Sequence, residues 1–587
     1  MRRRYEQLRA ALPHVQLQPA AALRRAWKQG YTREIFRADL VAGIAVGVVA
    51  LPLSMALAIA SGVPPQHGLY TAIVGGAIIA ILGGSKVQVS GPTAAFVVLL
   101  APVSARYGLG GLLLATAMAG VILIAMGVMR MGRLIQFIPY PVTTGFTAGI
   151  AVVIATLQFK DLLGLDVPHT PEKYLERVGE LFRALPSSRW QDFAVGAFTL
   201  IVLLLVPRFT KRVPAALIAL SLAAAGATLL PHVIPQFSVA TIGTRFSYVA
   251  DGVVHGGLPQ LPPLPVLPWN FPAADGHPLV LSLELVRSLL SSAFAIAVLG
   301  AIASLLSAVV ADGLSGKRHD PDAELVAQGV GNIIAPFFGG IAATGAIART
   351  ATNVRAGART PIAAVIHSVF LLVAIAACAP LLSYLPMASM AALLLVVAWN
   401  MSEARHFLHT VRVAPKSDVL ILLTCFSLTI LFDMVVSVTF GVLLAALLFM
   451  KRMADVADVR MVGDRHSQLL EPLPQSVLIY EIAGPLFFGA AQKAASVLGD
   501  VQAGVSIVII DMRAVPIMDA TGLVNLESVL AKLNEAKVLV IFGGVQKQPM
   551  SVFDHADWPK DDARFLICET IQEAIAQARS RGAGSGG

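Results

Sequence analysis

The stretch FFGGIAATGAIART, residues 337–350, breaks a long apolar run and brings a single arginine, Arg349, into it. Gly339 and Gly340 precede a short segment, Ile341 to Thr344, and Gly345 begins a new apolar helix. Glycine pairs interrupt helices because they favour turns over continued helical backbone. The pattern predicts a hydrophobic segment that is broken near its middle.

An earlier stretch, ILGGSKVQVSGPTAAF, residues 81–96, repeats this order of features. Gly83 and Gly84 precede a β-prone segment, Lys86 to Ser90, and Gly91-Pro92 opens another apolar helix. The chain therefore contains two related halves, each with one broken segment.

The composition of the whole chain predicts a membrane protein. Of its 587 residues, 56% are hydrophobic and 13% are charged, and the mean hydropathy is +0.74. Apolar runs near the ~20 residues needed to cross a bilayer recur from about residue 38 to about residue 450. The fold class is a polytopic α-helical membrane protein with about fourteen spans.

Basic clusters between the apolar runs indicate the topology. On the fourteen-span count, each follows an even-numbered span, on the same side as the basic N-terminus. The clusters are RMGR at 130–133, RFTKR at 208–212, KRH at 317–319, residues 355–359, EARHFLHTVRVAPK at 403–416, and Lys451-Arg452. We expect both termini in the cytoplasm, and we attribute the net charge of +9 to topology rather than to nucleic-acid binding.

The composition changes twice along the chain. A proline-rich connection from about 232 to 280 has few Lys or Arg, so it is expected outside, between two halves of about seven spans each. After Arg452, short β-branched strands alternate with amphipathic helices, which predicts a small α/β domain. The expected divisions are a cytoplasmic N-terminal segment 1–37, a membrane domain 38–455, a linker 456–473, the soluble domain 474–580 and a flexible tail 581–587.

The two broken segments predict an anion site. On the span count, the helix from Pro92 runs outward from mid-membrane and the helix from Gly345 runs inward, so their N-termini meet. Each N-terminus presents unpaired N–H groups and about half a positive charge. Inverted repeats with half-helices that meet at the midplane recur among secondary transporters.

Arg349 lies one turn into the second half-helix, about 9 Å from Arg355 at ~1.5 Å per residue. A cation at mid-membrane is costly and usually lines a cavity or meets a counter-ion. Either Arg349 adds positive potential behind a bound anion, or its side chain reaches to the cytoplasmic face near Arg355.

Other polar residues of the spans have two interpretations each. Thr93, Thr344 and Thr350 are candidate hydroxyl donors to the anion or local helix-capping groups. Pro52 and Ser54 indicate either an unwound segment that faces the cavity or a proline kink. Lys86 is expected to be structural, and His67 and His367 are expected not to be proton relays.

Enzymatic and metal chemistry find no support in the sequence. The three cysteines, Cys378, Cys425 and Cys568, form no CxxC pair, and no nucleophile–base pair or phosphate loop is recognisable. We therefore expect no enzyme activity, metal or cofactor.

Several stretches resemble the sulfate permease (SulP) family of anion transporters. They are ALPLSMALAIASGVPPQHGLYTAI, SGPTAAF, LGAIASLLSAVVADGLSG, ELVAQGVGNIIAPFFGG and GAIARTATNVRAGARTPIAAVIHS. IIDMRAVPIMDATGL resembles the STAS domain of that family, and AIARTATNVRAGARTP with AALLLVVAWNMSEARH most resembles its bacterial C4-dicarboxylic acid transporter subgroup. The resemblance implies a seven-plus-seven inverted repeat with core and gate domains, a homodimer, and the bacterial inner membrane.

The resemblance also implies which residues bind the anion. The site would lie between the N-termini of the third and tenth spans, with a contribution from the first span. The residues implied are Leu53, Ser54, Gly91, Pro92, Thr93, Ala94, Ala95, Thr344, Gly345, Ala346, Ile347, Ala348 and Arg349.

The chain departs from the family pattern in the eighth span. Family members often carry Glu or Asp there, associated with proton or sodium coupling, where this chain reads LGAIASLLS with Ala303. Ser307, one turn later, cannot supply the missing charge. Either the chain is a facilitator or exchanger, or Ala303 is an engineered replacement that disables coupling.

In the STAS-like region, DATG at 519–522 matches the position where related antagonists are phosphorylated. Asp519 and Thr521 are either regulatory, open to a cytoplasmic partner, or Asp519 simply caps the following helix.

The leading hypothesis is a secondary transporter of small anions, with proton-coupled uptake of C4-dicarboxylates such as succinate, fumarate or aspartate. A sulfate or bicarbonate transporter or exchanger is the alternative within the class. A membrane anion sensor that signals through the STAS domain is the alternative of another class.

Overall fold

The computed structural model describes residues 20–582 except 134–138, 168–170, 172, 211–212, 251–252, 433, 457, 462–472, 488–490, 493–495, 498–503 and 559–564. The chain forms two compact units, Met1–Val442 and Leu443–Gly587. Most of the predicted N-terminal segment, linker and flexible tail falls outside the described residues.

The first unit is a bundle of membrane-spanning helices. In the described part of the chain, ten helices are long and apolar enough to cross a membrane. One of them, α6 (Ala94–Val128), joins two helical segments at Gly108, whose φ of 70° is not helical. Three further helices of 9 to 16 residues complete the bundle, namely α13 (Pro321–Ile334), α14 (Ile347–Arg355) and α18 (Lys416–Leu431). With these, the bundle has the fourteen segments that the sequence predicts.

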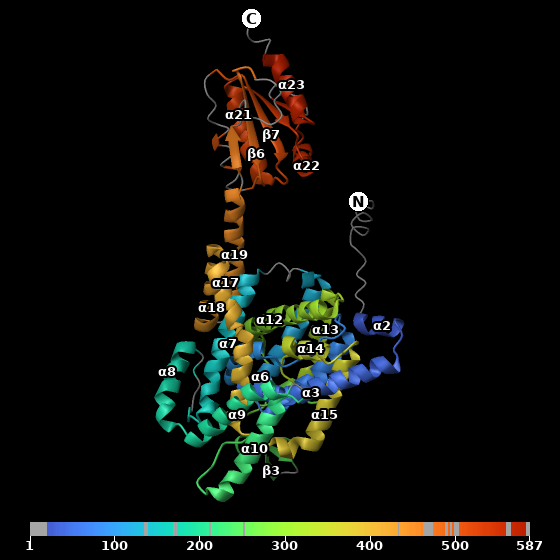
Figure 1. Ribbon diagram of the computed structural model, residues 1–587, viewed down its shortest axis with the longest axis vertical. Coiled ribbons are helices and arrows are strands. Elements are labelled where there is room, and N and C mark those ends of the chain that lie inside the picture. Colours follow the sequence, from blue (N-terminus) through green and yellow to red (C-terminus); the bar gives the residue numbers. More distant parts are fainter. Residues whose placement is uncertain are drawn as a thin grey trace. The chain divides into compact units, whose positions relative to one another are not determined.

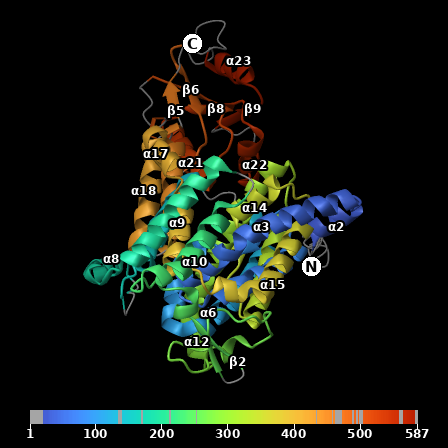
Figure 2. The same cartoon turned by 60° about the horizontal axis from the view of Figure 1, so that its bottom comes forward.

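The helices pack in two groups, which are the core and gate domains (Figures 1 and 2). In the core, α6 packs against α12 and α13, and α3 packs against α15. In the gate, α7 packs against α16 and α18, and α9 packs against α10 and α16. The core comprises α3 (Arg33–Ala60), α4–η1–α5 (Pro65–Leu82), α6, α12 (Leu283–Ser315), α13, α14 and α15 (Ile362–Leu382). The gate comprises α7 (Tyr140–Leu162), α9 (Trp190–Phe209), α10 (Ala215–Val233), α16 (Met387–Ser402), α18 and α19 (Met434–Val456).

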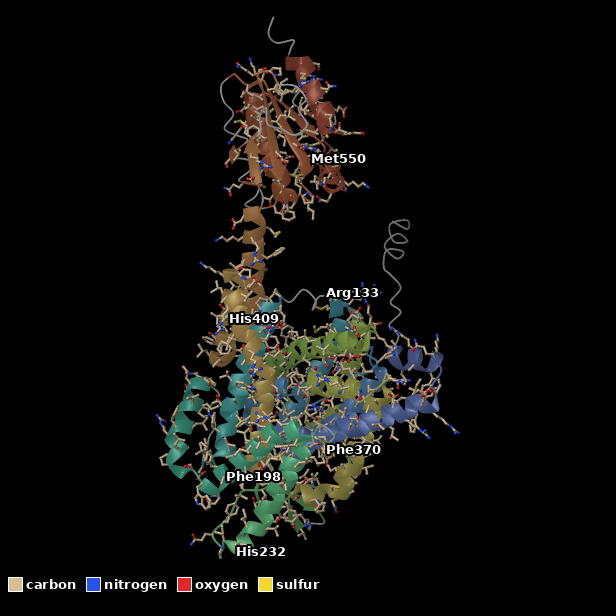
Figure 3. All side chains as sticks on the ribbon, in the orientation of Figure 1. Arg133, Phe198, His232, Phe370, His409 and Met550 are labelled. Atoms are coloured by element: carbon tan, nitrogen blue, oxygen red, sulfur yellow. The ribbon has the colours of Figure 1, made fainter. Side chains whose placement is uncertain are left out.

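Labelled basic residues lie at both ends of this bundle. Arg133 and His409 lie at one end of the first unit, and His232 lies at the other (Figure 3). The short amphipathic helices α2 (Ala21–Lys28) and α17 (Ala404–Val413) carry further basic residues. The connection after α10 holds α11 (Ile242–Arg245) and the hairpin β2 (Ser247–Ala250) and β3 (Val253–Gly256).

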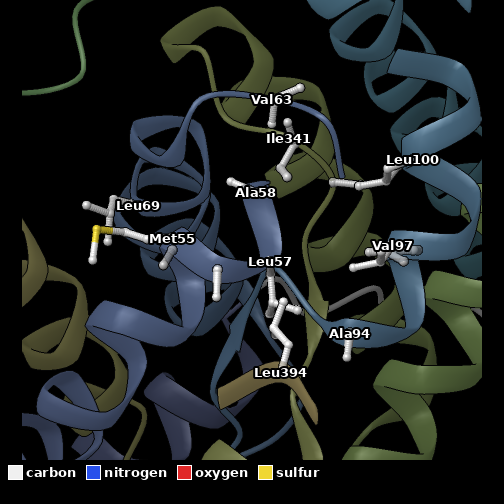
Figure 4. Packing of buried hydrophobic residues seen from close by; sticks show 14 of the residues in the cluster. Met55, Leu57, Ala58, Val63, Leu69, Ala94, Val97, Leu100, Ile341 and Leu394 are labelled. Atoms are coloured by element: carbon white, nitrogen blue, oxygen red, sulfur yellow. The ribbon is translucent and has the colours of Figure 1, made fainter. Parts of the chain in front are cut away.

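The apolar core joins the first span to the second half of the chain. Leu57 and Ala58 of α3 are buried in one cluster with Val97 and Leu100 of α6 and with Ile341. Figure 4 shows Leu394 of the gate helix α16 next to Leu57. The α3 helix is continuous through Pro52, so of the two alternatives for this position the unwound segment is wrong.

The two broken segments are joined by a sheet of two short strands. β1 (Ser90–Gly91) pairs antiparallel with β4 (Thr344–Gly345), with Ser90 opposite Gly345 and Gly91 opposite Thr344. Because these residues are extended, the half-helices begin two residues later than predicted, α6 at Ala94 and α14 at Ile347. The pairing places the two helix starts side by side.

The second unit contains a five-stranded sheet in the order β5-β6-β7-β8-β9, in which β5 is antiparallel and the other strands are parallel. The helices α21 (Ala520–Glu535) and α22 (Lys547–His555) cover one face, and α23 (Ile571–Gly582) covers the other (Figure 1). The strands are β5 (Asp458–Met461), β6 (Val477–Ala483), β7 (Ile507–Ala514), β8 (Leu539–Gly543) and β9 (Phe565–Cys568). This is the predicted α/β domain.

Asn332 of α13 holds the backbone of the second break. Its amide oxygen accepts the N–H of Ala343 at 2.8 Å, and its amide nitrogen donates to the carbonyl of Ala343 at 2.8 Å. The same nitrogen also donates to the carbonyl of Gln328. One side chain thus satisfies both backbone groups of a buried, non-helical residue.

We predict that Asn332→Ala lowers the free energy of unfolding by about 2–5 kcal/mol, because it leaves two buried backbone groups of Ala343 unpaired. Thermal unfolding of the detergent-solubilised chain measures this as a lower midpoint. Asn400→Ala is the control, since Asn400 is exposed. An unchanged midpoint in Asn332→Ala would contradict this account of the break.

Candidate functional site

The candidate site lies at the N-terminal ends of α6 and α14. The β1–β4 pairing brings them together, and the N–H of Ala346 is bonded to the carbonyl of Val89 at 2.9 Å. The first N–H groups of a helix have no partner inside it. Each start also carries about half a positive charge, so the two together attract an anion.

Arg349 lies between these two helix starts. Its side chain is 2% exposed, and its Nη2 donates to the carbonyl of Pro92. A β-carbon built on Gly91 would lie 2.7 Å from Nη1 of Arg349, so glycine is needed for this approach. The side chain therefore points into the protein, and the alternative that it reaches the cytoplasmic face is wrong.

Four polar side chains of the core helices have buried atoms without a hydrogen-bond partner among the described residues. They come from four elements, the helix α3, the start of α6, α14 and α15. The atoms are Ser54 Oγ, Thr93 Oγ1, Nε and Nη1 of Arg349, and both ring nitrogens of His367. Buried polar atoms are normally bonded, so this concentration of free groups fits a place where a polar ligand binds.

The sequence predicts that neither His67 nor His367 is a proton relay, and the structure gives the two rings different surroundings. His67 has Nδ1 bonded to the carbonyl of Gly339 at 2.7 Å and packs edge-on against Tyr70 and Phe271. Among the described residues, His367 has no such partner outside its own helix, where the backbone of Ala364 lies close to its ring.

Two predicted hydroxyl donors are engaged in holding the breaks. Thr344 donates to the carbonyl of Gly300 at 2.8 Å. Thr350 accepts the N–H of Val89 at 3.1 Å and lies 3.0 Å from the hydroxyl of Ser307. These contacts fit the capping and packing interpretation for both threonines, while Thr93 keeps a free hydroxyl.

Ala303 lies on the face of α12 that meets β4 and α14. Gly300 and Ser307, one turn to either side, contact Thr344 and Thr350 as described above. A carboxylate at position 303 would therefore project toward the second break.

Glu324 of α13 is a buried carboxylate close to the first break. It accepts the N–H groups of Gly84 and Ser85 at 3.0 and 3.2 Å. The hydroxyl of Ser304 and the side-chain amide of Gln328 also donate to it. These four donors are all neutral, so Glu324 holds backbone at the first break rather than pairing with Arg349.

The remaining predicted site residues differ in burial and packing. A β-carbon on Gly345 would lie 2.0 Å from Nε2 of Gln88, which explains the glycine there by packing. Leu53 packs against the apolar core. Ala94 and Ala346 are buried, Ala95 is half-buried, and Ile347 and Ala348 at the start of α14 are exposed.

A cavity of about 480 Å³ lies next to α14. Thr352 lines it and follows the exposed Ala348 by one turn on the same face of α14. The other lining residues come from α3 and from the start of α10, namely Ala45, Val48, Val49, Val213, Pro214 and Leu217. The cavity thus lies between a core helix pair and a gate helix, and its walls are apolar.

In the second unit, Asp519 caps α21. Its carboxylate accepts the N–H of Gly522 at 2.8 Å, which confirms the capping interpretation. Thr521 is half-buried in the first turn of that helix. The regulatory role of Asp519 and Thr521 remains a prediction.

Comparisons with known protein families identify a family for the membrane unit and a domain type for the second unit. The model of the sulfate permease family matches residues 36–425, and the model of the STAS domain matches residues 472–574. "Putative sulfate transporter YvdB" of Bacillus subtilis is 39% identical over 522 residues, which cover 89% of this chain and 94% of the relative. "Bicarbonate transporter BicA" of Picosynechococcus is 28% identical over 86% of this chain and 88% of the relative.

Solved structures show the same fold. The transmembrane domain of a cyanobacterial bicarbonate transporter BicA aligns with a TM-score of 0.60 at 27% identity, over 70% of this chain and 98% of that chain. Murine Slc26a9, an anion transporter in the inward-facing state, aligns with a TM-score of 0.81 over 96% of this chain and 94% of that one. Because murine Slc26a9 is 18% identical to this chain, the alignment shows a shared fold alone.

We predict that Arg349→Gln weakens anion binding about 10- to 100-fold, because a charge-assisted hydrogen bond contributes about 1.5–3 kcal/mol. Gly91→Ala is expected to weaken binding roughly tenfold by displacing the guanidinium. Calorimetric titration of fumarate and sulfate into the purified chain measures both.

Gly313→Ala is the matched control, since a β-carbon there meets nothing within 4 Å. If Arg349→Gln and Gly91→Ala both bind the anions with wild-type affinity, Arg349 does not belong to the anion site.

Proposed function

The chain belongs to the sulfate permease family of anion transporters, and from this premise we propose that it carries small dianions, C4-dicarboxylates first among them. It is a transporter and not an enzyme. The observation that carries the proposal is the concentration of positive charge at the two helix starts.

The proposed substrate charge follows from the residues of the site. Arg349 supplies one full positive charge, and the starts of α6 and α14 supply about half a charge each. No carboxylate is bonded to Arg349 in the described part of the chain. A total of about two positive charges matches a dianion better than a monoanion.

The size and chemistry of the substrate are supported by the surroundings of the site. The hydroxyls of Ser54 and Thr93 and the free nitrogens of Arg349 are donors suited to carboxylate oxygens. The cavity beside α14 is lined by Thr352 and otherwise by apolar residues, and such a wall suits the methylene or vinyl carbons of a dicarboxylate. The resemblance of AIARTATNVRAGARTP to the dicarboxylate subgroup supports the same assignment.

Sulfate is the second candidate. It is also a dianion, and YvdB carries sulfate in its name. Bicarbonate, which appears in the name of the BicA relatives, has one charge and fits the site charge less well.

We further propose that substrate reaches the site through movement of the core against the gate. The cavity beside α14 touches α3, α14 and α10 and so offers an access path from one side. Arg133 and His409, from two of the predicted cytoplasmic clusters, lie at the same end of the first unit, which supports a cytoplasmic location for both termini, with the chain in the bacterial inner membrane. Homodimer formation is proposed from the family resemblance.

We expect proteoliposomes preloaded with unlabelled succinate to accumulate labelled succinate by counterflow, since exchange needs no coupling ion. Unlabelled fumarate should compete, sulfate should compete less, and bicarbonate should not compete. Empty liposomes and Arg349→Gln are the controls.

Counterflow of sulfate but not of succinate would transfer the assignment to sulfate. Tight binding of an anion without any counterflow would contradict transport and favour the sensor hypothesis.

A further inference from the structure

The short helix α2 lies where two membrane spans end. The N–H groups of Ala20 and Ala22 donate to the carbonyls of Leu82 and Gly83 at 2.9 and 3.3 Å, at the end of the second span. The first span, α3, begins at Arg33, five residues after the end of α2. Five residues reach about 18 Å at most, at ~3.6 Å per residue. α2 is therefore held at the edge of the bilayer, next to the start of α3 (Figures 1 and 2).

The two sides of α2 differ in chemistry. One side is buried through three alanines, Ala21, Ala22 and Ala26, and packs on the protein. The opposite side carries Arg24 and Trp27, both of which are exposed. The helix therefore presents charge and an aromatic ring away from the bundle.

The exposed surface of α2 and of the first two turns of α3 is strongly basic. It has a single acidic side chain, Glu34, and five exposed basic ones. The five are Arg24, Arg25, Lys28, Arg33 and Arg37. None of them forms an ion pair with an acidic side chain in the part of the chain that the structure describes. The rings of Trp27 and Phe36, 63% and 45% exposed, belong to the same segment.

We propose that this basic surface binds the headgroup of an anionic phospholipid. The phosphate accepts hydrogen bonds from the guanidinium and ammonium groups, and the two aromatic rings suit the layer between headgroups and acyl chains. A soluble polyanion fits less well, because the surface lies at the ends of two spans and carries apolar rings beside its charges. The inference goes beyond the proposed function and does not depend on it.

α2 also contacts the first broken segment of the core. Besides the bonds to Leu82 and Gly83, the ammonium group of Lys86 donates to the amide oxygen of Gln29, directly after α2, at 3.0 Å. The strand β1 begins four residues after Lys86. A headgroup that holds α2 in place therefore also steadies the chain that leads into β1.

A second set of contacts leads from α2 to the other broken segment. The ring of Tyr31 stacks on Trp27 with the centroids 5.7 Å apart, and its hydroxyl donates to Asp39 at 3.3 Å. Asp39 accepts the N–H groups of Arg359 and Thr360 at 2.8 and 3.1 Å, in the connection between α14 and α15. Headgroup binding at α2 is thus linked to both halves of the core.

The experiment is titration of short-chain phosphatidylglycerol and phosphatidylcholine into the full-length chain in detergent, with bound lipid counted by native mass spectrometry. The variant Arg24→Gln/Arg25→Gln/Lys28→Gln removes three charges from α2. The matched control removes three exposed lysines of the second unit and has the same change in net charge. It is Lys532→Gln/Lys537→Gln/Lys547→Gln.

We expect the α2 variant to bind phosphatidylglycerol about 100-fold more weakly than the wild-type chain, since each Lys or Arg near anionic headgroups contributes about fivefold. The control variant should bind it as the wild type does. Phosphatidylcholine, whose headgroup has no net charge, should bind weakly and equally to all three chains.

Hydrogen exchange of the wild-type chain provides a test that needs no variant. The chain is placed in nanodiscs of phosphatidylcholine with or without an equal part of phosphatidylglycerol. The anionic lipid should slow exchange at the amides of Ala20 and Ala22, and at those of Arg359 and Thr360, because a ligand stabilises the state that it binds.

Equal affinity of the wild-type chain for the two lipids would overturn the proposal, because headgroup charge would then have no role. Equal binding of phosphatidylglycerol by the wild type and the α2 variant would also overturn it, since another surface would then hold the lipid. If the α2 variant does not fold, the exchange measurement decides, and unchanged exchange in residues 20–37 contradicts the proposal. None of these results bears on the dianion assignment, which the counterflow experiment tests.

Discussion

The fold of the membrane unit depends on one constraint, that backbone N–H and C=O groups in a bilayer must find partners within the protein. Both breaks expose such groups. The pairing of β1 with β4 satisfies some of them, and side chains satisfy others, with Asn332 bonded to Ala343 and Asn353 bonded to the carbonyl of Val87. Glu324 accepts two N–H groups at the end of the second span. The N–H groups at the starts of α6 and α14 are then the ones that remain available to a ligand.

That arrangement determines the chemistry of the site. Two helix starts that are held together by the backbone repel each other, and Arg349 adds to the repulsion. This repulsion is tolerated because the pairing of β1 with β4, two residues in each strand, holds the two helix starts in place. An anion relieves it, so the binding energy comes largely from charge that is already in place. Such a site recognises the charge of its substrate more strongly than its shape.

The sequence predicted the architecture because glycine pairs, apolar length and basic clusters each report a local physical requirement. It predicted the helical membrane unit with its two broken segments and the C-terminal α/β domain. It started the half-helices two residues early, at Pro92 and Gly345, because short antiparallel pairing between distant segments leaves no local pattern. It also treated His67 and His367 alike, since a partner outside the helix depends on contacts such as that of His67 with Gly339, which lie far apart in sequence.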